Sequence, residues 1–204
     1  MSKKFLIGVG IIVLLVLFVY SFFSGNYNKL VSLDEGVKQA WAEVQNNYQR
    51  RADLIPNLVE TVKGAAKFEQ ETLQKVIEAR SNATRPEINA ENVLNDPQAF
   101  QRFQQAQDNL GAALSRLLVV VERYPELKAN QNYLDLQTQL EGTENRLTTA
   151  RRRFNEAVQT YNSMARTFPV NLIAGMFGFQ QRPYFEASAA AQRAPRVDFG
   201  GDKN

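Results

Sequence analysis

The segment YQRRADLIPNLVETVKGAAKFE, residues 48–69, decides how the rest of the chain is arranged. It lies within residues 27–80, where apolar side chains recur three and four positions apart, and this spacing predicts one buried stripe on a long helix. The stripe interrupts its step at Arg51, which takes an inward-facing position, and Pro56 follows and removes one backbone donor. We therefore predict a kinked helix with a charge near the kink, whose stripe comprises Leu30, Leu33, Val37, Trp41, Val44, Tyr48, Ile55, Leu58, Val62 and Ala65.

The same residues resemble the signature of the LemA family. A tyrosine, two arginines and an aspartate precede LIPNLV, and VKG and FE follow it. Further stretches are similar to other recurring blocks of the family: YNKLVSLDEGVKQAW (27–41), ARSNA (79–83), RRFNEAVQTYN (152–162) and FPVNLIAGMFGF (168–179). The resemblance implies a small bacterial membrane protein with one N-terminal span and an antiparallel helical bundle. It leaves the biochemical activity open.

Composition excludes several classes of function. The formal net charge of the 204 residues is +3, and setting aside Lys3 and Lys4 leaves +1 for everything after them, so nucleic-acid binding gains no support. Cysteine and histidine are both absent, which excludes disulfides, thiolate or imidazole metal ligands and any catalytic triad that needs histidine. We expect no cofactor, no metal and no catalytic residue, and thus a protein that is not an enzyme.

Residues 5–23 contain no charged side chain and are rich in leucine, isoleucine and valine. As a helix they extend roughly 28 Å, which nearly matches the hydrocarbon core of a bilayer. Bulky aromatics follow where a signal peptide would place small residues, so we predict an uncleaved anchor in contact with membrane lipid. Lys3 and Lys4 precede the span, and Lys29 and Lys38 follow it, which favours a cytoplasmic N-terminus. We therefore expect a single-pass protein of the bacterial inner membrane, with residues 26–186 outside the cytoplasm.

The rest of the chain predicts an all-α bundle. Ser24 and Gly25 are expected to break the span, with Ser32 capping a new helix and Glu35 completing a capping box. The alternative is that the anchor and the first bundle helix are nearly continuous. Asp96 followed by Pro97 is a strong helix start after a long connection at 81–96.

Two further apolar stripes follow this start. The first ends before Pro125, and the second runs from Tyr133 to Phe168 and is stopped by Pro169. Together with the part of the first helix beyond Pro56, these helices form an antiparallel up-and-down bundle of about four long helices. We assign residues 1–4 to a short tail, 5–23 to the anchor, 26–186 to the bundle and 187–204 to a disordered tail.

The sharpest polar cluster consists of Arg50, Arg51, Asp53 and Asn57. An inward-facing guanidinium needs an acceptor to offset its desolvation, and Arg50 and Asp53 have the i,i+3 spacing of an ion pair. One interpretation is a salt-bridge network that fixes helix register around the kink, with the Asn57 amide serving carbonyls that the kink frees. The alternative is that Arg51 stays partly open and holds an anion or the carboxylate of a partner.

Two surfaces are candidates for protein contacts. The polar face of the helix after Asp96 is mostly uncharged and suits another helix; it comprises Gln98, Gln101, Gln104, Gln105, Gln107 and Asn109. Residues 170–179 are almost wholly apolar but too short to cross a bilayer, so we expect a cover other than lipid. This candidate contact patch comprises Val170, Leu172, Ile173, Met176, Phe177 and Phe179.

These features favour a membrane-anchored structural or adaptor protein that presents a rigid bundle to protein partners, including a second copy of itself. A second hypothesis is a hydrolase that uses Asp53 or Glu69 as acid or base, but general acid–base catalysis needs positioned, paired groups, and the spacing shows none. A third is a regulator of a neighbouring membrane protease, which the sequence does not separate from the first.

Overall fold

The computed structural model describes residues 3–64, 69–85 and 90–186. These residues form seven helices and no strand, which confirms the predicted all-α class. The tail predicted at 187–204 lies outside the described residues. The helices are α1 (Lys3–Lys63), α2 (Gln70–Ala83), α3 (Ala90–Asn95), α4 (Pro97–Val121), α5 (Pro125–Lys128), α6 (Gln131–Arg166) and α7 (Val170–Phe177).

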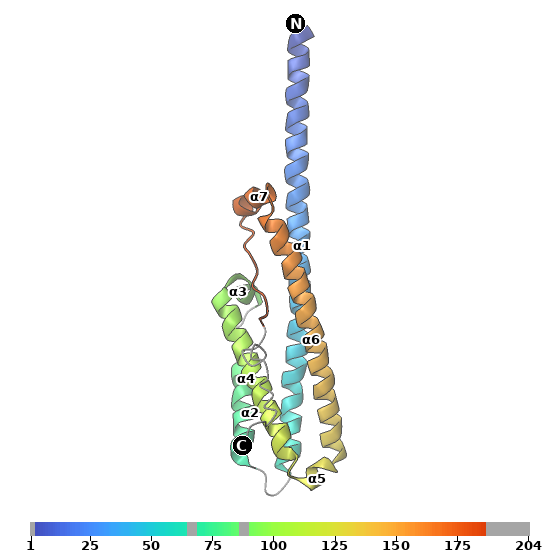
Figure 1. The fold of residues 1–204 in the computed structure, drawn as a ribbon, viewed down its shortest axis with the longest axis vertical. Coiled ribbons are helices and arrows are strands. Elements are labelled where there is room, and N and C mark those ends of the chain that lie inside the picture. Colours follow the sequence, from blue (N-terminus) through green and yellow to red (C-terminus); the bar gives the residue numbers. More distant parts are fainter. Residues whose placement is uncertain (1–2, 65–68, 86–89, 187–204) are drawn as a thin grey trace, which may run out of the picture.

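Helix α1 is continuous over 61 residues, about 90 Å, from the apolar segment to the far end of the bundle (Figure 1). The predicted break at Ser24 and Gly25, with a restart at Ser32, is therefore wrong. A single glycine costs a helix only about 1 kcal/mol, too little to end one that packing holds on its far side. Nearby polar side chains also bond back to the helix, since the Asn26 amide donates to the Phe22 carbonyl at 2.8 Å.

Pro56 does not end α1 either. Proline has no N–H to donate to the carbonyl of Ala52, four residues earlier. The Arg80 Nε atom on α2 donates to that carbonyl at 2.8 Å, so the freed acceptor is satisfied by another helix. The chain separates into two helices at Gly64 rather than at Pro56, and α2 becomes the fourth long element of the bundle.

The four longest helices run up and down, as predicted (Figure 1). Helix α6 lies along α1, and α4 lies along α2. The connection expected at 81–96 contains α3, and its apolar pair Val93 and Leu94 is buried, so that part of the segment belongs to the core. Asp96 caps α4 as predicted, because its carboxylate accepts from the backbone N–H of Gln98 at 2.8 Å.

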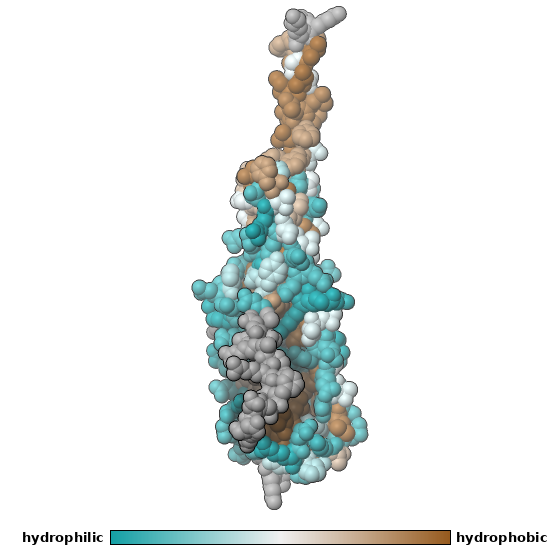
Figure 2. Space-filling view, viewed as in Figure 1, coloured by the Kyte–Doolittle hydropathy of each residue, from teal (hydrophilic) through white to brown (hydrophobic). Residues whose placement is uncertain are grey.

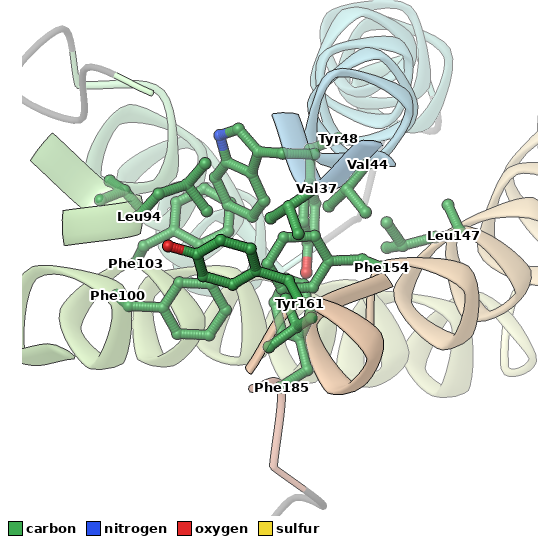
Figure 3. Close-up of a cluster of buried hydrophobic side chains, with 14 residues drawn as sticks. Val37, Val44, Tyr48, Leu94, Phe100, Phe103, Leu147, Phe154, Tyr161 and Phe185 are labelled. Atoms are coloured by element: carbon green, nitrogen blue, oxygen red, sulfur yellow. The ribbon is translucent and has the colours of Figure 1, made fainter. Parts of the chain in front are cut away.

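The core is aromatic at its middle, where Phe100, Phe103 and Phe154 gather (Figure 3), and Trp41 belongs to the same cluster. The Trp41 ring lies 5.1 Å from Phe103 and 5.4 Å from Phe154, measured between centroids, and is fully buried. Its indole N–H has no acceptor among the described residues. Two further apolar clusters extend the core, one toward Lys63 and one beside α7.

The apolar segment of α1 projects from the bundle with its side chains uncovered (Figure 2). Within the described residues, α1 is the one helix long and apolar enough to cross a membrane. The apolar surface ends where the polar surface of the bundle begins (Figure 2). This division is the one expected of a helix with one end in lipid and the other in a water-soluble domain.

Candidate functional site

Arg51 is buried at the junction of three helices, with 3% of its side chain exposed. Its Nη2 atom donates to the Gln107 side-chain oxygen at 2.7 Å and to the Gln107 backbone carbonyl at 3.2 Å. Its Nη1 atom contacts the carboxylate of Glu144 on α6 at 3.2 Å. The Nε atom has no acceptor among the described residues. One charge thus connects α1, α4 and α6.

A second arginine extends this cluster. Arg151 on α6 donates from Nε to the Tyr48 hydroxyl at 2.7 Å and approaches the Asp108 carboxylate at 3.4 Å. The guanidinium of Arg51 lies 5.1 Å from the centroid of the Tyr48 ring. Burial raises the pKa of Tyr48 to about 12, although the nearby positive charge of Arg151 opposes the shift. The phenol therefore stays neutral at physiological pH.

The predicted members of the cluster are only partly brought together. Arg51 points inward as expected, but Arg50 is exposed, and among the described residues it forms no ion pair with Asp53. Asp53 is also exposed and accepts from the Gln49 amide at 2.7 Å. Asn57 is exposed, and the carbonyl that Pro56 frees is served by an arginine of α2 instead of its amide.

Sequence reasoning missed two partners of Arg51, Gln107 and Glu144. A signal existed for Gln107, because it lies four residues after Phe103 and three before Leu110, an inward-facing position that holds a polar side chain. Glu144 gave no such signal, since it is 56% exposed and reaches Arg51 from the rim. The arrangement holds three helices in register, and Arg51 is too deeply buried to offer its charge to an external ion without a rearrangement.

An open groove lies between α2 and α4, with a volume of about 550 Å³. Its floor contains small side chains, including Ala79, Ala106 and Ala113. Four positive side chains line it: Lys75 on α2, Arg85 just after α2, and Arg102 and Arg116 on α4. Glu78 is the single carboxylate in this lining. Gln105 and Asn109 of the predicted polar face also line this groove.

The other members of that polar face are placed differently. Gln107 is buried beside Arg51, and Gln104 donates to the backbone carbonyl of Glu186 at 2.9 Å. Gln98 and Gln101 are exposed. The predicted helix-contact face is therefore divided between the core, the groove and the surface.

The apolar patch at 170–179 is also divided. Val170 and Ile173 are buried against α1 and α6, and Phe179 is partly buried. Three of its members are exposed: Leu172 at 56%, Met176 at 72% and Phe177 at 56%. Phe168 was predicted to end the core stripe of α6, but the helix stops at Arg166 and Phe168 is 77% exposed.

The two carboxylates considered for hydrolysis lie on different elements. Asp53 is on the outer face of α1, and Glu69 precedes α2, where it approaches Arg123 at 3.9 Å. Across the described ranges, no group of three histidine, cysteine, aspartate or glutamate side chains could hold a metal ion.

Comparisons with known proteins agree with the resemblance seen in the sequence. The chain is 26% identical over 179 residues to magnetosome protein MamQ 2 of Paramagnetospirillum magneticum, a match that covers 80% of this chain and 66% of the relative. It is 25% identical over 169 residues to protein LemA of Metamycoplasma hominis, covering 83% of this chain and 73% of the relative. The chain thus spans just under two thirds of the MamQ relative's length. The LemA family model matches residues 40–199, most of the chain, and this protein belongs to the LemA family.

Proposed function

We propose that this protein is a membrane-tethered adaptor whose bundle presents the groove between α2 and α4 to an acidic, helical segment of a partner protein. The observation that supports the tether is the continuity of α1, which joins the uncovered apolar segment to the bundle without a flexible link. A continuous helix fixes the distance and direction of the bundle relative to the membrane. This rigid coupling distinguishes such an adaptor from a domain that a flexible linker joins to its membrane anchor.

The tether would hold the groove well away from the lipid surface. Arg80 of α2 contacts the carbonyl of Ala52, and Ala52 lies 29 residues beyond Phe23, the end of the apolar segment. At 1.5 Å per residue this separation is about 45 Å. Lipid charge is screened within roughly 8 to 10 Å at physiological salt. The groove therefore meets its partner without competition from the membrane surface.

The charge of the groove selects the partner. Lys75, Arg85, Arg102 and Arg116 outnumber Glu78, although Lys75 is partly neutralised by Glu71 at 2.5 Å and Arg102 by Asp96 at 3.8 Å. Small side chains on the floor let the backbone of an incoming helix approach closely, and arginines at the rim suit carboxylates. A regulator of a membrane protease would be one such adaptor. The enzyme alternative lacks a comparable observation, since Asp53 and Glu69 are exposed and belong to separate elements.

We place the bundle outside the cytoplasm, because Lys3 and Lys4 precede the apolar segment. Protease added to intact spheroplasts is expected to digest the bundle. Full protection of the bundle, with digestion only after lysis, would reverse the orientation. The adaptor proposal itself holds for either orientation.

Photo-crosslinking in the intact membrane tests the groove. A benzophenone side chain at Gln105, in the groove, is expected to give discrete adducts whose crosslinked peptides are acidic. The same side chain at Asn145, exposed on α6, is the matched control and should give none of these adducts. Charge reversal at Arg102 and Arg116 should abolish the adducts, whereas reversal at Arg152, an exposed cation of α6, should not. Adducts that survive the groove reversal, or peptides without an acidic segment, would refute the proposed site.

A further inference from the structure

Helix α7 has two faces with different surroundings. Val170, Ile173 and Ala174 pack against the bundle. On the opposite side Leu172 and Met176 are 56% and 72% exposed. Phe177 lies on the same stripe as the buried residues, beside Tyr27, and is still 56% exposed, and Phe168 just before the helix is 77% exposed. Large apolar side chains that gather on one exposed face mark a site that something covers.

The position of α7 along α1 indicates what covers it. The Phe177 ring lies 4.8 Å from the ring of Tyr27, centroid to centroid, and Phe22 packs against the cluster beneath α7. Tyr27 is four residues beyond Phe23, about 6 Å along the helix axis. Helix α7 therefore lies beside the end of the apolar segment, and its apolar surface adjoins that of the segment (Figure 2).

The exposed charges nearest the apolar segment at this end of the molecule are positive. Neither residues 5–33 nor residues 157–185 contain an aspartate or glutamate. Lys29 and Arg166 are exposed there, while Arg182 is paired with Asp34 at 2.7 Å. Exposed apolar side chains beside cations, without carboxylates, are the combination that binds the interface of a bilayer containing anionic lipids.

We propose that α7 lies in the membrane interface, with Phe168, Leu172 and Met176 inserted among the lipid headgroups and upper acyl chains. This inference rests on the proposed anchoring of α1. It replaces the expectation that a protein covers residues 170–179. The buried face of α7 then sets the bundle against the bilayer at a second point, so that α1 is held at a fixed tilt and rotation about its own axis.

Depth-dependent quenching tests this placement in the full chain. The protein has no cysteine, so a single Met176→Cys exchange takes one environment-sensitive fluorophore. The protein is reconstituted in vesicles of phosphatidylcholine and phosphatidylglycerol that carry a nitroxide near the headgroup end of the acyl chain. Val119→Cys, an exposed apolar position on α4 away from the membrane, is the matched control, and Val13→Cys reports on the apolar segment itself.

We expect several-fold stronger quenching at position 176 than at position 119, and a loss of that excess when Leu172→Glu is added. Quenching at position 13 with none at position 176 would overturn the interfacial helix and leave the anchor intact. No lipid quenching at either position would overturn both. A water-excluded emission at position 176 without lipid quenching would show a protein or a second copy covering α7, and this too would overturn the proposal.

Discussion

Removing the side-chain acceptor of Arg51 is the perturbation whose cost the structure defines best. Gln107→Leu removes the 2.7 Å bond to Nη2 and leaves the buried guanidinium with the backbone carbonyl and Glu144, both at 3.2 Å. It also strips the Ala83 carbonyl of its bond from the Gln107 amide. An incompletely paired buried charge costs about 3 to 5 kcal/mol, and the remaining acceptors place this variant at the lower end of that range.

Removing the charge itself should cost less. Arg51→Met leaves the Gln107 oxygen unpaired, a loss of about 1 to 3 kcal/mol, and frees Glu144, which is 56% exposed and returns to water. The double variant Arg51→Met/Gln107→Leu has no buried charge, so it should lose less stability than the sum of the two single variants. The coupling between Arg51 and Gln107 is expected to exceed about 1 kcal/mol.

Thermal unfolding of the full chain in detergent, followed by circular dichroism, measures these differences. For a domain of this size about 1 kcal/mol shifts Tm by roughly 2 to 4 °C, so Gln107→Leu should lower Tm by roughly 6 to 12 °C. Asp53→Asn is the control, because Asp53 is exposed and accepts a hydrogen bond from Gln49, one helical turn earlier. The Tm of this variant should equal that of the unchanged protein. Additive losses for Arg51→Met and Gln107→Leu, or an equal loss for Asp53→Asn, would refute the coupling.

Three further results are expected. Arg80→Met should cost about 1 to 3 kcal/mol by leaving the Ala52 carbonyl unpaired, and much less in a Pro56→Ala background, where residue 56 regains its own donor; equal Tm losses in both backgrounds would contradict this. Because the folded pKa of Tyr48, about 12, lies above its ordinary value of 10.0, the contribution of this phenol to the free energy of unfolding should be fully present below pH 10. That contribution should fall by roughly 3 kcal/mol between about pH 10 and 12, and Tyr48→Phe should remove this part of the loss in denaturant titrations. Residues 26–187 without the apolar segment should be soluble and strongly helical by circular dichroism, and a strand or coil spectrum would contradict the fold.

Periodicity predicted the core faces of the long helices because it is a local property of the chain. Of the predicted stripe of α1, Leu30, Val37, Trp41 and Leu58 are all fully buried, and Leu33 is the described member left at intermediate exposure. A buried stripe follows from the 3.6-residue repeat whichever helix covers it. The repeat does not say which helix covers the stripe, so the groove between α2 and α4 could not be predicted from the sequence.

Helix ends were predicted less well where a distant side chain decides them. Pro56 was expected to mark the boundary of the fourth helix, but a donor from α2 replaces the missing N–H. Arg80 is 28 positions from Ala52, and no local rule relates them. By contrast, the start of α4 was predicted correctly, because the cap and the proline that define it are adjacent in sequence.

For the candidate cluster, the inward-facing charge was predicted correctly, but the predicted ion pair was wrong. Arg51 was correctly expected to face inward, but the carboxylate proposed for the neighbouring Arg50 was Asp53, chosen because it is near in sequence. Residues two apart on a helix do not share a face, so a buried Arg51 puts Asp53 outside. The true acceptors lie 56 and 93 positions away.

Polar groups on the inner face of α1 occur at three levels along the helix, and each one pairs with a different segment later in the chain. Asp34 pairs with Arg182 beyond α7, Arg51 with α4 and α6, and the carbonyl that Pro56 frees with Arg80 of α2. A slip of one helical turn, about 5.4 Å, would keep apolar side chains against apolar side chains, because the stripes repeat at nearly that interval. The same slip would carry every one of these polar groups out of hydrogen-bond range and leave charges buried without partners. Apolar periodicity therefore holds the helices together, whereas the polar contacts along α1 fix where each later helix stops relative to it.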